Sequence, residues 1–133
     1  MILHINDSRM LREIQLDLCK YYPYLRMEFY PSDKITQYHS SGLTKLDPYL
    51  KTGSVRKQHH AGIIDIMPGT TIKAFKEKMK NDFNLYIRLL HFTKEGWVSS
   101  DKLESFSLDE LNEKGRHIFH DFNNVSGQLK NLF

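Results

Sequence analysis

The stretch TTIKAFKEKMKNDFNLYIRLL, residues 70–90, holds two hydrophobic periods in succession. Apolar residues recur first in steps of three, four and four, and then in steps of two, at Ile72, Phe75, Met79, Phe83, Leu85, Ile87 and Leu89. The first spacing places side chains on one stripe of a helix, and the second places them on one face of a strand. This stretch therefore predicts a helix followed by a strand.

A matching pattern occurs near the amino end, in MLREIQLDLCKYYPYLRMEF, residues 10–29. A short alternating segment precedes each copy, with Leu3 and Ile5 before the first and Ile64 and Ile66 before the second. The apolar positions of the two copies are Leu3, Ile5, Leu11, Ile14, Leu18, Tyr22, Leu25, Met27 and Phe29, and Ile64, Ile66, Ile72, Phe75, Met79, Phe83, Leu85, Ile87 and Leu89. The first six are related by a shift of 61 residues and the last three by 60, with Pro23 as the extra residue. Each copy therefore predicts strand, helix, strand.

Two such units in one chain favour an α+β fold of the ferredoxin-like type. A helix that links two strands of one sheet makes a right-handed crossover, so the strands of each unit are expected to be parallel. Residues 1–30 and 61–91 would then share one four-stranded antiparallel sheet with both helices on the same face. In that order the first strands of the two units are central neighbours.

Three features lie outside the duplicated units, and the whole chain, residues 1–133, is expected to form one domain. Residues 31–60 make a long connection that contains five Lys or Arg and two Asp, so it is basic. Residues 92–133 begin with a predicted turn at Thr93–Gly96, and a short strand follows at Trp97 and Val98. Ser107 and Glu110 then have capping-box spacing, which predicts a helix over 108–122 softened at Gly115.

Composition indicates an ordinary globular protein, with 40% hydrophobic and 26% charged residues and a net charge of +3. The single Cys19 excludes an internal disulfide and is typical of a reducing compartment. We find no signal-peptide pattern and no run of 18 apolar residues, so we expect a cytoplasmic protein without a membrane span.

The face of the predicted sheet that points away from the helices is one candidate binding surface. Tyr24, Arg26, Tyr86 and Arg88 would lie there, and bases can stack on such aromatic side chains while Arg holds phosphate. The basic connection would add Arg56, Lys57, His59 and His60. The RNP signature is absent, and Glu28 and Asp65 would repel phosphate.

Catalytic and metal chemistry have weaker support in the sequence. His4 and Asp65 would approach each other on central strands, as a possible acid–base pair or as a structural hydrogen-bonded pair. No HExxH motif, paired cysteines, Walker loop or dinucleotide fingerprint accompanies them, so we predict no metal and no cofactor.

The segments FNLYIRLLHFTKEGWVSSDKLESFSLDELNEKGRH, IMPGTTIKAFKEKMKND and YYPYLRMEFY resemble a group of small uncharacterised bacterial proteins, frequent in Bacteroidetes. The shared features are the paired strand–helix–strand units, the Trp after the second unit and the SLDELNEKGR-like segment. This resemblance implies a similar fold and transfers no activity to any residue here.

Taken together, the patterns favour a non-enzymatic binding or adaptor domain that contacts a protein partner or forms a homodimer. An uncovered edge strand can recruit another chain by extending the sheet. A nucleic-acid-binding regulator is the alternative, and a small hydrolase or metal-dependent enzyme using His4 and Asp65 is the third possibility.

Overall fold

The computed structural model describes residues 1–31 and 44–132, with the side chains of the last helix described as far as Asn123. Its mixture of helices and antiparallel strands confirms the α+β class. The elements are, in chain order, β1 (Ile2–Ile5), α1 (Leu11–Tyr21), β2 (Leu25–Tyr30), the 3-10 turn η1 (Thr52–Ser54), β3 (Gly62–Asp65), α3 (Ile72–Phe83), β4 (Tyr86–Thr93), β5 (Gly96–Ser99) and α4 (Leu108–Leu132).

The hydrophobic core consists mainly of the repeated apolar positions. The nine positions of each copy are all buried, and they form one cluster together with Leu108 and Leu111 of α4. Burial of that many aliphatic and aromatic side chains is the main stabilising term of the fold. The periodicity in the sequence therefore selected the core correctly.

The expected single four-stranded sheet was wrong, and the ferredoxin-like arrangement is not confirmed. Among the described residues, β1 pairs only with β3, and β2, β4 and β5 form a separate sheet in the order β2-β4-β5. In the ferredoxin-like order β4 would pair with β1, but β2 and β5 occupy the two edges of β4 instead. The two strands of each unit therefore lie in different sheets. Periodicity indicates which side chains face the core, whereas it does not indicate which strand pairs with which.

Both strand pairings are symmetric under the shift that relates the two copies. In the β1–β3 ribbon Leu3 lies opposite Ile64, its own counterpart 61 residues later. In the β2–β4 ladder Glu28 lies opposite Arg88, its counterpart 60 residues later. Each half thus completes its strands with those of the other half, as two subunits do across a two-fold interface.

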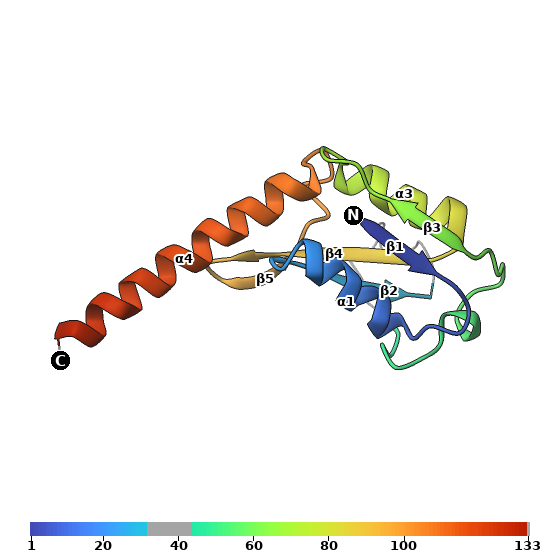
Figure 1. Ribbon diagram of the computed structural model, residues 1–133, viewed down its shortest axis with the longest axis horizontal. Coiled ribbons are helices and arrows are strands. Elements are labelled where there is room, and N and C mark those ends of the chain that lie inside the picture. The colour runs from blue at the N-terminus through green and yellow to red at the C-terminus, as the bar shows by residue number, and fades with distance from the viewer. Residues whose placement is uncertain (32–43, 133) are drawn as a thin grey trace.

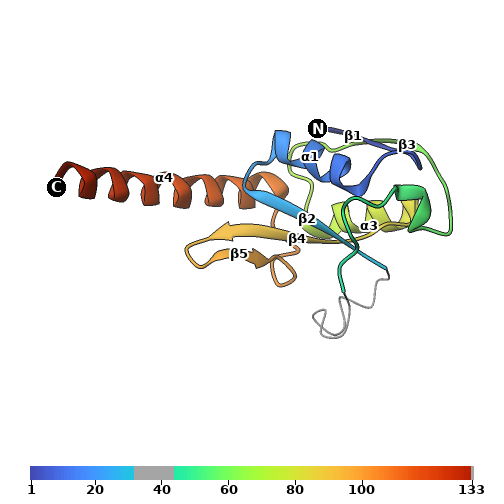
Figure 2. The ribbon, with the colours of Figure 1, turned by 90° about the horizontal axis from the view of Figure 1, so that it is seen from below.

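The core is enclosed on four sides. Figure 1 shows the β1–β3 ribbon between α1 and α3, and Figure 2 shows the ribbon and the β2-β4-β5 sheet on opposite sides of the core. Both helices pack on the core face of the sheet, where Met27 and Leu89 lie opposite each other. The ribbon covers the remaining side of the core with Leu3, Ile5 and Ile64.

Capping interactions lie at the ends of the helices, and the capping box expected at Ser107 and Glu110 is present. The Thr71 side chain accepts a hydrogen bond from the Ala74 N–H at 3.1 Å, and Asn84 ends α3 in the left-handed conformation, with φ 55°. Ser107 and Glu110 form the reciprocal capping box of α4. At the start of α1 the Glu13 carboxylate instead accepts the Met10 N–H at 3.0 Å.

Helix α4 begins at Leu108 as expected, but it continues to Leu132 and projects beyond the sheet (Figures 1 and 2). The expected softening at Gly115 was wrong. A Cβ at Gly115 would lie 2.6 Å from the Tyr24 Cβ, so this glycine allows α4 to approach the chain closely at the start of β2.

None of the helices in the described part of the chain combines the length and the apolar character that a bilayer crossing requires. Of the predicted basic loop 31–60, residues 32–43 lie outside the described residues. The remainder of the loop runs back along the amino ends of α1 and β3 and is described with the candidate site.

Candidate binding groove

The edge of β2 that points away from β4 faces α1. Three carbonyls of this edge already have partners there: the Gln15 Nε2–H donates to the Met27 carbonyl at 2.8 Å, the Cys19 thiol lies 3.7 Å from the Leu25 carbonyl, and the Leu46 N–H donates to the Phe29 carbonyl at 2.7 Å. Two of these partners are side chains that can rotate away. The third is a backbone group that closes one end of the edge.

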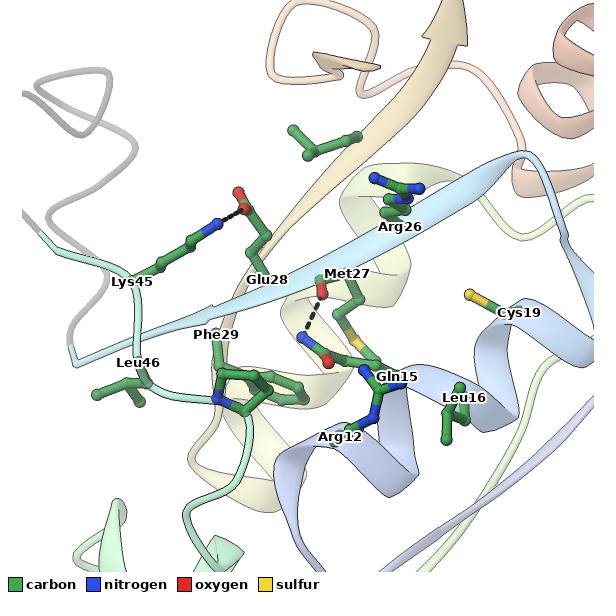
Figure 3. Close-up of a pocket in the computed structure, with 12 residues that line it drawn as sticks. Arg12, Gln15, Leu16, Cys19, Arg26, Met27, Glu28, Phe29, Lys45 and Leu46 are labelled. Atoms are coloured by element: carbon green, nitrogen blue, oxygen red, sulfur yellow. Dashed lines mark hydrogen bonds and ion pairs between the residues drawn. The ribbon is translucent and has the colours of Figure 1, made fainter. Parts of the chain in front are cut away.

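A hollow of about 480 Å³ runs along this edge (Figure 3). Its lining includes Arg26 and Glu28 from one face of β2 and Met27 and Phe29 from the other. Since successive side chains of a strand point to opposite faces, a hollow lined by both sets follows the strand edge rather than either face of the sheet. The other lining residues are Arg12, Gln15, Leu16, Cys19, Lys45, Leu46, Pro48 and Leu90.

The charge of the groove is positive, because its lining holds three basic side chains, Arg12, Arg26 and Lys45, and one acidic side chain, Glu28. Lys45 Nζ lies 3.1 Å from a Glu28 oxygen, so that pair is largely neutralised. The Arg26 guanidinium lies over the Trp97 ring, 4.0 Å from its centroid, which holds this charge beside the groove. An acidic ligand is therefore favoured over a basic one.

Cys19 is the residue in the groove that could act as a nucleophile, and its surroundings oppose that role. Burial raises the pKa of the Cys19 thiol, so the thiol stays protonated at neutral pH and acts as a weak donor toward the Leu25 carbonyl. The lining residues include no histidine to activate it. This chemistry is suited to binding rather than to covalent catalysis.

The second half of the molecule has the same backbone frame around the counterpart of this groove. The Arg12 N–H donates to the Pro48 carbonyl, and its counterpart Lys73 donates in the same way to the Glu104 carbonyl. Gln15, however, corresponds to Lys76. Lys76 Nζ lies 2.8 Å from a Glu104 oxygen and 3.7 Å from an Asp101 oxygen, so ion pairs span this space in the second half.

The residues predicted for the outer sheet face do not form one open surface. Tyr24 packs against the Phe119 ring of α4, with centroids 5.6 Å apart. Arg88 is buried and lies 3.0 Å from an Asp101 oxygen. Tyr86 is half-buried opposite Tyr30, and Arg26 alone of the predicted four lines the groove.

In the described part of the basic loop, Arg56 is buried and structural. Its guanidinium donates to the Asp7 carboxylate at 2.8 and 3.0 Å and to the Phe83 carbonyl at 2.9 Å. His59 Nδ1 lies 2.9 Å from the other Asp7 oxygen. The Arg56 hydrogen bond is the main cause that lowers the pKa of Asp7. Lys57 and His60 are exposed.

His4 and Asp65 lie on the exposed side of the β1–β3 ribbon, where they are not directly opposite each other. His4 lies opposite Ile63, and Asp65 lies opposite Ile2. Among the interactions of the described residues, no hydrogen bond or ion pair joins His4 to Asp65. Within residues 1–31 and 44–123, no three His, Cys, Asp or Glu side chains lie close enough together to hold a metal ion.

Sequence reasoning missed most of the groove, because Gln15, Leu16, Lys45 and Leu46 come from separate segments. One signal was present: Leu16 is apolar but lies off the helix stripe, and it is 47% exposed. A large apolar side chain on the polar side of an amphipathic helix is a reason to look for a contact surface there.

Comparison of the chain with protein-family models, with curated proteins and with solved structures finds no match. The resemblance to the small bacterial proteins thus stays a prediction, and the groove has to be interpreted from its own geometry.

Proposed function

We propose that this protein is a protein-binding domain that captures an extended, acidic segment of a partner along the edge of β2 that points away from β4. The observation that carries the proposal is the hollow lined by both faces of this edge strand. An added strand contacts both faces of the strand it joins, whereas a ligand on a sheet face contacts one.

The position of the partner segment follows from the existing hydrogen bonds. The Leu46 N–H already uses the Phe29 carbonyl, so the incoming strand pairs at the Leu25 and Met27 end. There it replaces the contacts of Cys19 and Gln15. The volume of about 480 Å³ lies within the range of ligand pockets, so the groove accommodates a short segment.

The chemistry of the partner follows from the charges. Arg12 and Arg26 flank the groove, and acidic side chains of the segment would pair with them, while exposed Leu16 offers an apolar contact. Ion pairs at a groove rim set specificity and association rate more than affinity. We therefore expect micromolar rather than nanomolar binding.

Peptides selected from a randomised displayed library on the full chain provide the test. Selected peptides should be acidic and extended, and Arg12→Glu should weaken their binding about tenfold in fluorescence anisotropy, which is about 1.4 kcal/mol. Lys73→Glu is the matched control, since Lys73 is the exposed counterpart of Arg12 in the second half, and it should leave binding unchanged.

Methylation of alternate backbone amides of a selected peptide tests the pairing itself. Strand addition predicts that one methylation register abolishes binding while the other register leaves it intact, because only alternate amides face the edge. Equal tolerance of both registers, or selected peptides that ignore Arg12→Glu, would refute the proposal.

The other expectations stay predictions. Tyr24 and Arg88 are used in internal contacts, which weakens the case for nucleic-acid binding on the sheet face. Catalysis by His4 and Asp65 has no support from their positions on the ribbon. A cytoplasmic location rests on the sequence, whose single Cys19 is typical of a reducing compartment.

A further inference from the structure

The apolar residues of α4 follow a heptad pattern that continues beyond the body of the molecule. Steps of four and three alternate along the sequence at Leu111, Gly115, Ile118, Phe122, Val125, Leu129 and Leu132. This spacing places the seven residues at successive a and d positions, and none of them is charged. Three heptads with this spacing are typical of a helix that packs along another helix.

The stripe changes its surroundings along the helix. Leu111 is buried in the core and Gly115 is buried against Tyr24, so the first heptad packs within the molecule. Phe119, next to the stripe, is 39% exposed, and Phe122 is 68% exposed. Figures 1 and 2 show that this part of α4 has left the sheet and runs away from it. At Phe122, the last residue of the stripe whose side chain is described, the apolar side of the helix is thus largely exposed.

A hollow of about 500 Å³ lies where α4 leaves the β4–β5 hairpin. Ile118 and Phe122 form one wall, and Phe92, Thr93, Lys94 and Gly96 of the hairpin form the other. An incoming helix would therefore find a recess at the start of the exposed stripe, into which an apolar side chain can insert.

The charges of α4 favour a second copy over a membrane surface. Residues 108–132 hold four acids, Asp109, Glu110, Glu113 and Asp121, against three bases, Lys114, Arg116 and Lys130. Helices that lie on anionic membranes are instead rich in Lys and Arg on their polar face. A nearly neutral helix does not repel its own copy, and its uncharged a and d positions suit self-association.

The amino-acid composition beyond Phe122 also indicates that this part of the helix is stabilised by packing against a partner. Asn123, Asn124, Ser126 and Gly127 are weak helix formers, and most helix stability in proteins comes from packing of an apolar face. The helix from Ile118 to Leu132 spans roughly 20 Å at 1.5 Å per residue, about two heptads of contact.

We propose that α4 is a dimerisation helix, whose apolar stripe packs against the same helix of a second copy of this chain. The pairing is centred on Ile118 and Phe122, and the heptad spacing of the sequence continues after them. It is separate from the β2 groove, so either proposal can fail without the other.

Sedimentation equilibrium of the full chain over a micromolar concentration series tests this pairing. Wild type should dimerise, and Phe122→Glu should raise the dissociation constant at least tenfold. Phe122 is largely exposed, so the thermal unfolding of the monomer should not change. His120→Glu is the matched control, because His120 is exposed and lies at the heptad position opposite the stripe, and it should dimerise like wild type.

Three outcomes would overturn the proposal. One is a wild-type chain that stays monomeric at the highest concentration, and another is a dimer that Phe122→Glu does not weaken. The third is a monomer that binds phosphatidylcholine vesicles through Phe122, which would show a lipid surface to be the occupant of the stripe.

Discussion

The two halves of the molecule share one core pattern and differ at the outer side of their long strand. In the first half Gln15 lies over the edge of β2 and a groove of about 480 Å³ is left. In the second half the counterpart Lys76 binds Asp101 and Glu104 from the segment after β5. The signs of the charges in the ion pairs at the strands are also reversed. In the first half the acidic Glu28 on β2 pairs with Lys45, and in the second half its basic counterpart Arg88 on β4 pairs with Asp101. A duplicated scaffold can thus close a feature with ion pairs in one copy and leave it as an open groove in the other.

The largest expected effect comes from truncation of equivalent core residues in the two halves. Ile14 and Phe75 occupy the same repeat position, and both are completely buried. We expect Ile14→Ala to destabilise by about 2–5 kcal/mol and Phe75→Ala by about 3–5 kcal/mol in urea unfolding. Both variants should unfold in a single transition, since each half supplies strands to the other.

A transition that separates into two steps, with one half unfolding before the other, would show that the two halves do not fold as one unit. Fluorescence of Trp97, in the second half, and far-ultraviolet circular dichroism would then give different midpoints.

Removal of the ion pairs that close the second half is expected to lower the free energy of unfolding by a smaller amount. Lys76→Gln introduces the residue of the first half and removes the ion pairs with Asp101 and Glu104. We expect a loss of about 1–2 kcal/mol in urea unfolding, because the Lys76 side chain is only 11% exposed. Lys73→Gln, on the same helix and exposed, should change stability by less than about 0.5 kcal/mol. Equal effects of the two substitutions would show that the ion pairs do not stabilise the second half.

The smallest effect concerns the link that joins the halves through Arg56. The pKa of Asp7 is lowered in the folded protein, so its ionised form favours folding above the ordinary carboxyl pKa. That contribution is lost as the pH falls through the lowered pKa. Wild type should therefore lose slightly more thermal stability than Asp7→Asn between pH 6 and pH 3, measured by calorimetry.

Asp65→Asn is the control for this titration, since Asp65 is exposed on the ribbon and is not bonded to Arg56. If wild type and Asp7→Asn lose stability in parallel with falling pH, the Asp7–Arg56 pair does not contribute.

Sequence patterns were sufficient for the core and for the start of α4. The repeated apolar positions are buried, and the cap at Ser107 and the turn before Gly96 lie where their residues indicate. The pairing of each half's strands with those of the other half, in two separate sheets, was not predictable in this way. Leu3 faces the core whether β1 pairs with β3 in a two-stranded ribbon or in a larger sheet.

The groove was harder to predict for a different reason. Gln15 and Lys45 line the same hollow only because the chain after β2 returns along α1, where the Leu11 and Arg12 N–H groups bond the Leu50 and Pro48 carbonyls. No hydrophobic periodicity in the sequence indicates this path of the chain. Arg56 shows the same limit, since a basic residue in a polar loop was interpreted as a surface charge and is buried.

The exchange of strands between the halves also has a consequence for synthesis of the chain. Among the described residues, β1 pairs with β3 and β2 pairs with β4. Residues 1–30 are therefore synthesised before either of their partner strands. Pairing over about sixty residues of separation is slow, because a long loop must close before the contacts form. Until Asp65 has emerged, the nascent chain exposes two unpaired strands and the apolar side of α1, and β2 stays unpaired until His91 has emerged. A chaperone or premature aggregation would act on the chain in this interval.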